Sequence, residues 1–521
     1  MVVKQRLRTT TLAVLATSLL GSSPVIAQGL SVNTFQDWNF LGGGARARGM
    51  GGAFLGVADD PDAGSWNPAG LVYNEGVLLT VNYAHTSFSS DLGGSPGGTP
   101  LSLFSSDNSF SNLPSAAFVA PVTIKEHEFT LTAFYNRLQQ AYAEGEFAAD
   151  GHTPGTPFEQ RSPIESRYAI RGNINILGGA FGTSVTDRLS IGGMIGIITG
   201  DGTENHVIDL DSTRVTSRGV DYVRWINDSD IDYGGFTAQL SAMYRADNWS
   251  VGAILSPGWT LTQNLDFRAV RITTTNQIPQ MNPTNGPLYG PLDGTDREID
   301  IPYTIGLGGS YNASDNLLIA VDYQLRPFKN SDSETGSGDS GLRYQTEPAD
   351  PLSPFEAQPV GWYNLHQIRA GIEYRHEARF GVIPIRLGIR NEPYVIGEPS
   401  GAIVTYDQRL GRDQTAEFPY FIPIAAASGT GDQINPIILS MGTGIQWSQV
   451  GFDFALEFGG YDYSEAGEMF MIGRCLDCDP LVDPDVNNDE YGRRKLYRWG
   501  NYTRAFDVSR VRLFLNFTGQ F

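Results

Sequence analysis

The sequence has few cysteines, few histidines, and no long hydrophobic run after residue 28. Its 2 cysteines and 6 histidines leave little material for a zinc site. A transmembrane helix needs about 18 or more consecutive apolar residues, and the chain beyond residue 28 offers no such stretch. Basic residues are scarce as well, 36 against 57 acidic ones, and a formal net charge of -21 makes nucleic acid a poor partner. Soluble domains and membrane β-barrels remain as the classes to separate.

The N-terminus has the order of a secretory signal peptide. Three basic residues precede an apolar stretch from Leu12 to Leu20, and the small residue Ala27 stands at the cleavage position. The apolar stretch is too short to span a bilayer. We therefore expect residues 1–27 to be a signal peptide and the mature chain to begin at Gln28.

Apolar and polar residues alternate along much of the remaining chain. Residues 452–458 place four apolar side chains on one face of a strand and Asp453 and Glu457 on the other. Residues 319–326 and 367–375 follow the same pattern. In a soluble sandwich the charged face would meet bulk water, whereas in a membrane barrel the apolar face meets lipid and the charges line the lumen. As a pair on one strand, Asp453 and Glu457 fit a lumen-lining row better than a catalytic pair.

The lengths of the connections separate these two classes. Strand patterns occur near residues 76–86, 114–121, 128–136, 168–182, 189–199, 232–245, 248–258, 299–311, 316–326, 365–375, 383–391, 436–447, 450–463 and 507–520. Short connections alternate with long polar ones, which is the topology of an outer-membrane barrel and is rare in compact soluble domains. We predict an all-β protein, a 14-stranded antiparallel transmembrane β-barrel over residues 76–521, with both termini in the periplasm. Residues 260–274 are assigned to a loop, with a strand as the alternative.

The final strand gives an independent indication of the compartment. Val511, Leu513, Leu515, Phe517 and the terminal Phe521 fall on one alternating face. Chains inserted by the barrel assembly machinery typically end in this way, so the resemblance implies that route into the bacterial outer membrane. Its acidic loops would share divalent cations with lipopolysaccharide phosphates, or would simply be solvated.

Residues 28–75 have no strand pattern. The stretch from Gly42 to Ala53 is rich in glycine, but it lacks the Gly-Lys-Ser/Thr ending of a phosphate loop and follows no hydrophobic strand. We expect glycine here to allow the backbone to pack closely in a confined space. Because Asp-Pro and Asn-Pro pairs favour turns, we expect a compact element with bends.

This segment resembles the N-terminal hatch of the FadL family, outer-membrane transporters of long-chain fatty acids and aromatic hydrocarbons. The likeness rests on the glycine-rich opening, on Ala58-Asp59-Asp60 and on Asn67-Pro68-Ala69-Gly70. It implies a hatch inside the lumen, a pocket for hydrophobic small molecules such as long-chain fatty acids, and release into outer-membrane lipid through a lateral opening. We also expect Asn67 to anchor the hatch where such an opening interrupts the wall.

A role in protein secretion is the alternative function. The sequence around Met50 and Trp66 is also similar to that of PorV-type barrels, which serve protein secretion by holding cargo proteins. The two functions differ in what they need: a transporter needs an apolar pocket, whereas a secretion partner needs exposed loops. No Ser/His/Asp arrangement indicates an enzyme.

The last long connection carries two further candidates. Cys475 and Cys478 are expected to form a small disulfide in an exported protein. Oxygen ligands then alternate at the spacing used by calcium loops, in Asp483, Asp485, Asn487 and Asp489. Asn488 stands where such a loop needs glycine, and Arg494 where it needs a bidentate glutamate. A structural calcium ion and a solvated acidic loop are the two alternatives, and no other cofactor is predicted.

Overall fold

The structure is a computed structural model that places most of the chain. It describes residues 38–94, 101–152, 161–211, 220–275, 278–283, 295–331, 333–335, 363–379, 381–395, 403–407, 421–425, 432–447, 449–474, 486–489 and 492–521. The signal-peptide prediction for residues 1–27 and the cysteines 475 and 478 lie outside these residues. None of the described helices is long and apolar enough to cross a membrane.

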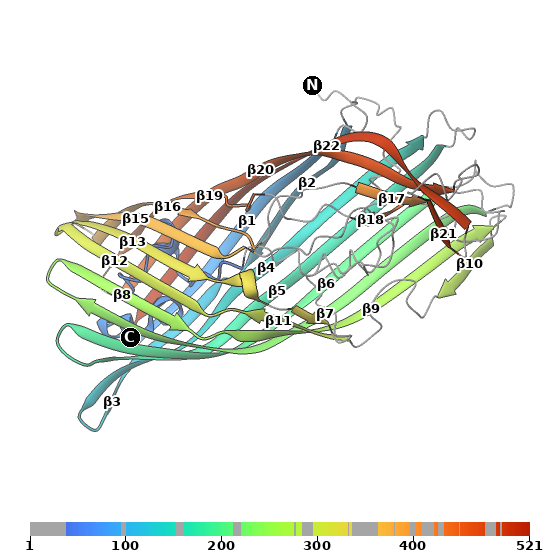
Figure 1. The fold of residues 1–521 in the computed structure, drawn as a ribbon. Coiled ribbons are helices and arrows are strands. Elements are labelled where there is room, and N and C mark those ends of the chain that lie inside the picture. Colours follow the sequence, from blue (N-terminus) through green and yellow to red (C-terminus); the bar gives the residue numbers. More distant parts are fainter. Residues whose placement is uncertain are drawn as a thin grey trace.

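Strands make up nearly all of the described chain (Figure 1). Within the described residues, helical turns are confined to α3 (Ala45–Gly49), α4 (Ala63–Trp66), η1 (Pro68–Tyr73) and η3 (Phe328–Asn330). The strands are β1 (Leu78–Gly94), β2 (Leu101–Asn112), β3 (Ser115–Ile124), β4 (His127–His152), β5 (Arg161–Ser184), β6 (Leu189–Asp211), β7 (Val220–Arg245), β8 (Trp249–Ser256), β9 (Trp259–Thr275), β10 (Ile278–Pro283), β11 (Thr295–Ile301), β12 (Thr304–Ser314), β13 (Leu317–Arg326), β14 (Ser333–Thr335), β15 (Leu365–Ala378), β16 (Gly381–Asn391), β17 (Ile403–Asp407), β18 (Phe421–Ala425), β19 (Ile437–Gln446), β20 (Val450–Arg474), β21 (Val486–Asp489) and β22 (Gly492–Gln520).

The strands close into one antiparallel barrel. Several labelled strands are pieces of a single wall strand: β2 continues as β3, β8 as β9, and β10 and β11 as β12. The short strands β14, β17, β18 and β21 only add to the ladder of β11, β20 and β22 or pair with each other, and they are not counted separately. The wall then has 14 strands, and β22 pairs with β1 from Gln520↔Leu78 onward to close the ring. The predicted fold class and strand number are confirmed.

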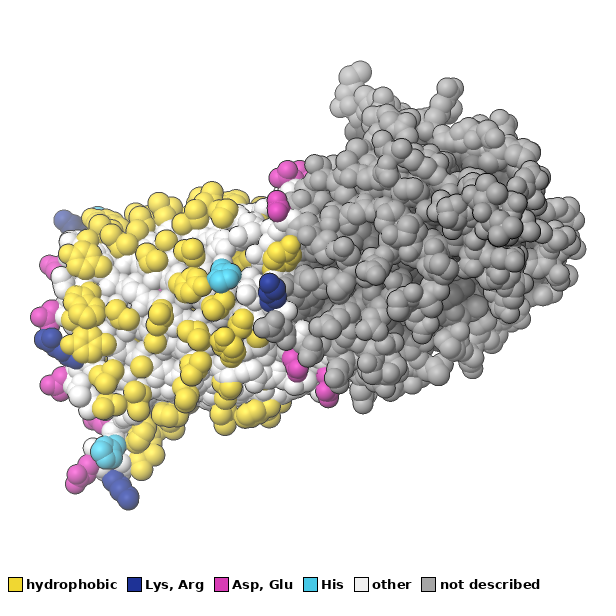
Figure 2. Space-filling model, in the orientation of Figure 1, with side chains coloured by type: hydrophobic (Ala, Val, Ile, Leu, Met, Phe, Trp, Pro, Cys, Tyr) yellow, Lys and Arg dark blue, Asp and Glu magenta, His cyan; other side chains and the backbone are white. Residues whose placement is uncertain are grey.

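The side chains of the wall alternate as a membrane barrel requires. On β15, for example, Ile368 is 58% exposed while the neighbouring Gln367 is 0% exposed, so one faces outward and the other inward. Figure 2 shows the outward hydrophobic side chains as a belt around the described part of the barrel, with charged side chains at its short-turn end. Because lipid offers no hydrogen-bond partners, this belt and the closed ladder together build a wall that can stand in a bilayer.

The connections differ from the sequence prediction at the far end of the barrel. Residues 260–274 form β9, which continues β8 beyond Pro257 and Gly258, so the loop assignment was wrong although the strand count stands. Much of the predicted long loops is also strand, since β4 and β7 each run for 26 residues. Above the membrane both faces of a strand meet water, so the hydrogen-bonded ladder continues without the apolar alternation that reveals it.

The short connections lie at one end, as predicted. The β3–β4 turn is tight, with Lys125 at a positive φ of 60°. The C-terminus lies at the same end, because the Phe521 amide donates to the Val77 carbonyl at 2.9 Å. The C-terminus is thus at the end with the short connections, while residues 28–37 lie outside the described part and the periplasmic side stays a prediction.

Candidate functional site

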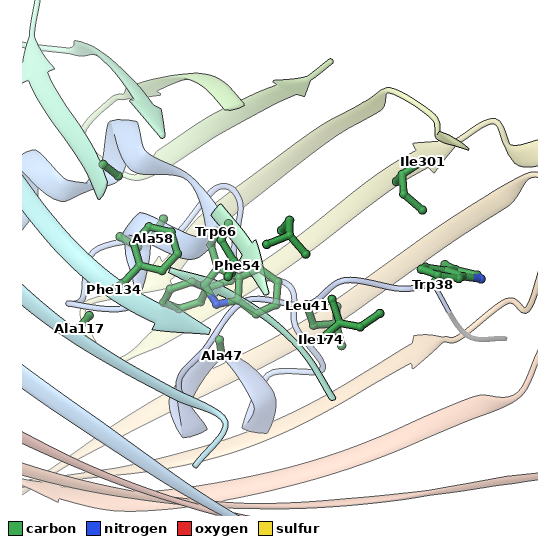
Figure 3. Packing of buried hydrophobic residues seen from close by; sticks show 14 of the residues in the cluster. Trp38, Leu41, Ala47, Phe54, Ala58, Trp66, Ala117, Phe134, Ile174 and Ile301 are labelled. Carbon is green, nitrogen blue, oxygen red and sulfur yellow. The ribbon is translucent and has the colours of Figure 1, made fainter. Parts of the chain in front are cut away.

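Residues 38–77, called the N-terminal segment below, lie inside the barrel. Their side chains are nearly all buried, and their partners are the inward-facing residues of the wall. Asp322 of β13, for example, accepts hydrogen bonds from the amides of Phe54 (2.7 Å) and Leu55 (2.8 Å). Figure 3 shows Phe54, Trp66 and Ala58 of this segment packed against wall residues such as Phe134. The segment fills the half of the lumen nearer the short turns.

Glycines of the wall allow this close packing. A Cβ atom at Gly388 would lie 2.0 Å from the amide nitrogen of Gly51, and one at Gly252 would lie 1.9 Å from the carbonyl oxygen of Leu55. Similar clashes with the N-terminal segment, each at 3.1 Å or less, would arise at Gly182, Gly192, Gly308, Gly371 and Gly442. Since only glycine leaves room for backbone at such distances, the wall and the segment are shaped for each other.

The two motifs that carry the family resemblance contact each other. A Cβ atom at Gly70 would lie 1.9 Å from the carbonyl oxygen of Ala58, which itself has a positive φ of 27°. Asp59 forms an ion pair with Arg46 at 2.6 Å, and the backbone carbonyl of Asp60 accepts a hydrogen bond from Asn74 at 3.2 Å. Burial alone would raise the pKa of Asp59, but the Arg46 guanidinium holds it below the usual value. The motifs thus form one packed unit within the N-terminal segment.

Asn67 is fully buried and bonded to backbone groups. Its amide donates to the Leu55 carbonyl at 2.8 Å, its side-chain oxygen accepts from the Ala69 amide at 3.2 Å, and it lies beside Ala242 of β7. The ladder between β7 and β8 is continuous there, because Ala242 pairs with Ala253. The expectation that Asn67 lies at an interruption of the wall is therefore wrong. Here proline at 68 starts η1, and Asn67 caps that turn.

Below and around the N-terminal segment, buried charges form ion pairs. Arg46 bonds Glu373 at 2.9 Å, and Arg386 joins Glu373 to Asp453, both at 2.6 Å. Arg390 binds Glu457 at 2.7 Å. We call these residues the paired network, together with Glu392 and Arg512, which bond each other at 2.7 Å. The charged residues that the alternating pattern placed on the inner face do line the lumen. Asp453 and Glu457 each form an ion pair with an arginine.

Asp62 joins the N-terminal segment to the closing strands of the barrel. It accepts bonds from Asn82 of β1 at 3.3 Å, Ser115 of β3 at 3.4 Å and Asn516 of β22 at 3.3 Å. None of these partners carries a charge, and Asp62 is 4% exposed. Burial therefore raises the pKa of Asp62 to about 6.

The half of the lumen beyond the N-terminal segment has an apolar lining. Buried aliphatic residues face inward from consecutive wall strands: Ile170, Ile174, Ile176, Ile198, Ile231, Leu261, Ile299 and Ile301. An aromatic cluster lies against them, because the Phe40 ring is 5.9 Å from Trp38 and 6.0 Å from Trp259, and Trp38 is 6.3 Å from Phe328. Figure 3 shows Trp38, Leu41, Ile174 and Ile301 on this side of the segment. Apolar solutes gain free energy by leaving water for such a surface.

The wall is interrupted between β2 and β4. The Arg137 amide donates to the Pro114 carbonyl at 2.7 Å, but beyond this bond no ladder joins the two strands among the described residues. There β2 pairs with β1, and β4 pairs with β5. Proline lacks the amide that a ladder needs, and a bulge at Leu138 bends β4. We call this interruption, from Leu113 upward, the seam.

Aromatic rings bridge the seam instead of hydrogen bonds. The Phe110 ring of β2 lies 5.3 Å from the Tyr142 ring of β4 and 6.5 Å from Phe88 of β1. The Arg171 guanidinium covers Tyr142 at 5.6 Å. Side chains turn within nanoseconds, whereas separating a hydrogen-bonded ladder in lipid costs several kcal/mol for each bond. Among the described residues, the upper parts of β2 and β4 are therefore joined by side-chain contacts and not by a hydrogen-bonded ladder.

Comparison with known proteins agrees with this architecture. No family pattern and no curated protein matches the chain. Among solved structures, the Ralstonia pickettii toluene transporter TbuX is similar, with a TM-score of 0.50 and 15% identity over 93% of this chain and 100% of that one. The chain has the fold of the FadL-type outer-membrane transporters. A Pseudomonas aeruginosa FadL homologue aligns over 92% of this chain and 99% of its own, with 13% identity and a TM-score of 0.49.

The remaining predicted sites fall where side chains are not described. Asn487 and Asp489 lie in β21, opposite Arg494 and Gly492 of β22, while residues 483 and 485 lie outside the described part. No group of three or more metal-ligating side chains occurs within the residues that are described. The disulfide and the calcium ion remain predictions. The seam was missed by the sequence analysis, although Pro114 at the start of a predicted strand is a signal for it.

Proposed function

We propose that the protein carries hydrophobic compounds across the outer membrane, into the apolar lumen and out through the seam into lipid. The interrupted ladder between β2 and β4 carries this proposal. A hydrophobic solute that reaches the apolar lining meets the paired network and the N-terminal segment below it, and an apolar solute has nothing to gain among buried charges. The rings of Phe110 and Tyr142 offer an apolar way through the wall.

The route is tested by bridging the seam. In a variant with Cys475→Ser and Cys478→Ser, the further changes Phe110→Cys and Tyr142→Cys allow a short bifunctional thiol reagent to join β2 to β4. We expect the crosslink to abolish uptake of a labelled long-chain fatty acid and of toluene in cells lacking their own transporters. Cleavage of a reducible crosslinker should restore uptake.

The control uses a ladder that is intact. Ile197 and Phe236 both face outward and pair directly across β6 and β7. Crosslinking Ile197→Cys to Phe236→Cys should leave uptake unchanged. Uptake that survives a complete crosslink of the seam would refute the lateral route, and absence of uptake by the parent would refute transport of these compounds.

Fatty acids and aromatic hydrocarbons are both included because the fold is shared by transporters of different compounds. We do not propose the alternative of holding secreted proteins, since no described feature of the connections favours it. The proposal predicts the same dependence on the seam for each compound that is carried.

A further inference from the structure

A glutamine in the apolar half of the lumen has no hydrogen-bond partner for its side chain. Gln263 of β9 is 1% exposed, and it faces inward because it alternates along the strand with the exposed residues Thr262 and Asn264. Its amide nitrogen and its side-chain oxygen are both buried, and neither bonds to any described part of the chain. Such a group costs free energy, because it has left water without gaining a new partner. The fold itself therefore gives no reason for a polar side chain at this position.

Gln239 of β7 shows how the same side chain is satisfied elsewhere in the lumen. It is also buried, with 7% exposure. Its nitrogen donates to the Trp66 carbonyl at 3.1 Å, and its oxygen accepts from the Ser256 hydroxyl at 3.2 Å. Because Trp66 belongs to the N-terminal segment, Gln239 helps to hold that segment against the wall. Gln263 makes no such contact among the described residues, so this structural role does not account for it.

The described neighbours of Gln263 on the inner face are mainly apolar. Leu261 precedes it on the inner face of β9 and pairs with Ile299 of β11, and both are 0% exposed. Across the other ladder, Gln263 pairs with Tyr233 of β7. A Cβ atom at Gly202 would lie 3.4 Å from the Tyr233 hydroxyl, so this hydroxyl lies over β6, on the far side of β7 from Gln263. The amide of Gln263 is thus a polar group set into the apolar lining.

We propose that the amide of Gln263 binds a neutral group that both donates and accepts a hydrogen bond, as the hydroxyl of a phenol or an alcohol does. The body of the compound then lies against the apolar lining. The amide suits such a group, because its nitrogen donates and its oxygen accepts. A hydrocarbon leaves both atoms unpaired, and buried polar groups discriminate strongly against a ligand that cannot pair with them. This inference rests on the proposed transport function and makes it more specific, since it selects hydroxylated compounds over hydrocarbons.

The burial of Gln263 determines how the compound is bound. A compound reaches the amide only where neighbouring side chains turn aside, and it then takes their place against the lining. The hydroxyl and the amide pair away from water, where a hydrogen bond is electrostatically stronger than in solution. Binding therefore relieves a cost that the empty protein carries at Gln263 and does not carry at Gln239, whose amide is already paired.

The binding test compares ligands in which a methyl group replaces the hydroxyl. Binding of 4-ethylphenol and 4-ethyltoluene, and of 1-octanol and nonane, is measured by equilibrium dialysis of the full mature protein in amphipol, with uptake by empty amphipol subtracted. The ratio of the two affinities within each pair is compared between the parent and Gln263→Met, which cancels the different hydrophobicities of the ligands. We expect Gln263→Met to shift this ratio at least about tenfold toward the methyl compound.

Gln446→Met is the matched control, because it makes the same change at an exposed position near the short-turn end of β19. It should leave the ratio unchanged. The same ratio in the parent and in Gln263→Met, for both pairs, overturns the proposal while leaving transport intact. A parent that binds none of the four compounds contradicts the proposed function itself. A shift in one pair alone supports the proposal and shows whether an aryl or an alkyl body fits beside Gln263.

Thermal unfolding of the empty protein tests the unpaired amide independently of any ligand. Gln263→Met removes a buried group without partners, so the unfolding midpoint should stay the same or rise. Gln239→Met removes a group with two partners, so the midpoint should fall. A midpoint that falls equally in both variants would show that the amide of Gln263 is already paired in the empty protein, which overturns the proposal.

Discussion

The two halves of the lumen are built on different principles. In the half nearer the short turns, the N-terminal segment sits against wall glycines, and arginines such as Arg386 meet carboxylates at 2.6 Å. In the other half the lining is aliphatic and aromatic, and Arg326 has no carboxylate among the described residues. In the first half arginines and carboxylates such as Arg386 and Glu373 pair with one another, whereas the second half is mainly apolar.

The two halves of the lumen therefore differ in whether their polar groups hold the fold together or are suited to a ligand. Charges that are mutually paired hold parts of a fold in place, and removing one partner strands the other in a medium of low dielectric constant. An apolar surface with an unpaired polar group is instead the usual composition of a ligand site. Under the proposed function, the half with the paired network closes the barrel and the half with the aromatic cluster binds the hydrophobic compound.

The largest expected effect comes from deleting most of the N-terminal segment. A 14-strand barrel is wide enough that side chains of the wall alone do not fill it. Deleting residues 28–70 should therefore raise single-channel conductance in planar bilayers severalfold. Assembly is checked by heat-modifiable migration on gels. A deletion variant that inserts normally but has the conductance of the parent would refute the hypothesis that the N-terminal segment plugs the barrel.

Breaking one pair of the network should have a large effect on stability. Arg386 and Arg375 both bond Glu373, but their side chains are 0% and 44% exposed. Because it leaves Asp453 without its arginine and removes one of the arginines that bond Glu373, Arg386→Gln should lower the free energy of unfolding by about 3–5 kcal/mol. Arg375→Gln should lower it by less than about 1 kcal/mol, since water screens that pair.

The measurement is urea unfolding of both variants in lipid vesicles. Equal shifts in the two variants would mean that the depth of a charge in the lumen does not determine its contribution. A shift confined to Arg386→Gln would support the paired network as a source of stability in this half of the lumen.

A smaller effect concerns pH, because Asp62 has neutral partners and a pKa raised to about 6. The folded state binds this proton more tightly than the unfolded state, whose aspartates have a pKa near 3.9. The contribution of Asp62 to stability is therefore full below about pH 4 and is lost as the pH rises through about 6. Asp62→Asn removes this dependence.

The thermal unfolding midpoints of parent and Asp62→Asn should consequently diverge with rising pH. The variant should gain relative to the parent between about pH 4 and pH 7. Two midpoint curves that run parallel across this range would show that Asp62 is not held protonated in the folded protein. Asp59, whose pKa is lowered by Arg46, provides the opposite case within the same segment.

Sequence alone located the membrane-crossing strands but not their full length. The segment at 365–375 was predicted almost as it stands in β15, since lipid and lumen impose opposite chemistry on alternate residues. The upper part of β9 was assigned to a loop, because a strand with water on both faces has no such constraint. Asn67 was predicted to bond to backbone groups at a gap in the wall, but its partners Leu55 and Ala69 lie in the N-terminal segment, beside an intact ladder.

The sequence by itself determined which face of each strand meets lipid, how many strands cross, and that residues before Leu78 form something other than wall. These features are local, because they depend on neighbouring residues and on the solvent. Only the tertiary structure decided that Glu373 meets both Arg46 and Arg386. It also decided that, among the described residues, no ladder joins β2 to β4 above Pro114 and no carboxylate pairs with Arg326 beside Phe40. Those outcomes depend on strand register and on what fills the lumen, which bring together residues as far apart as positions 46 and 373.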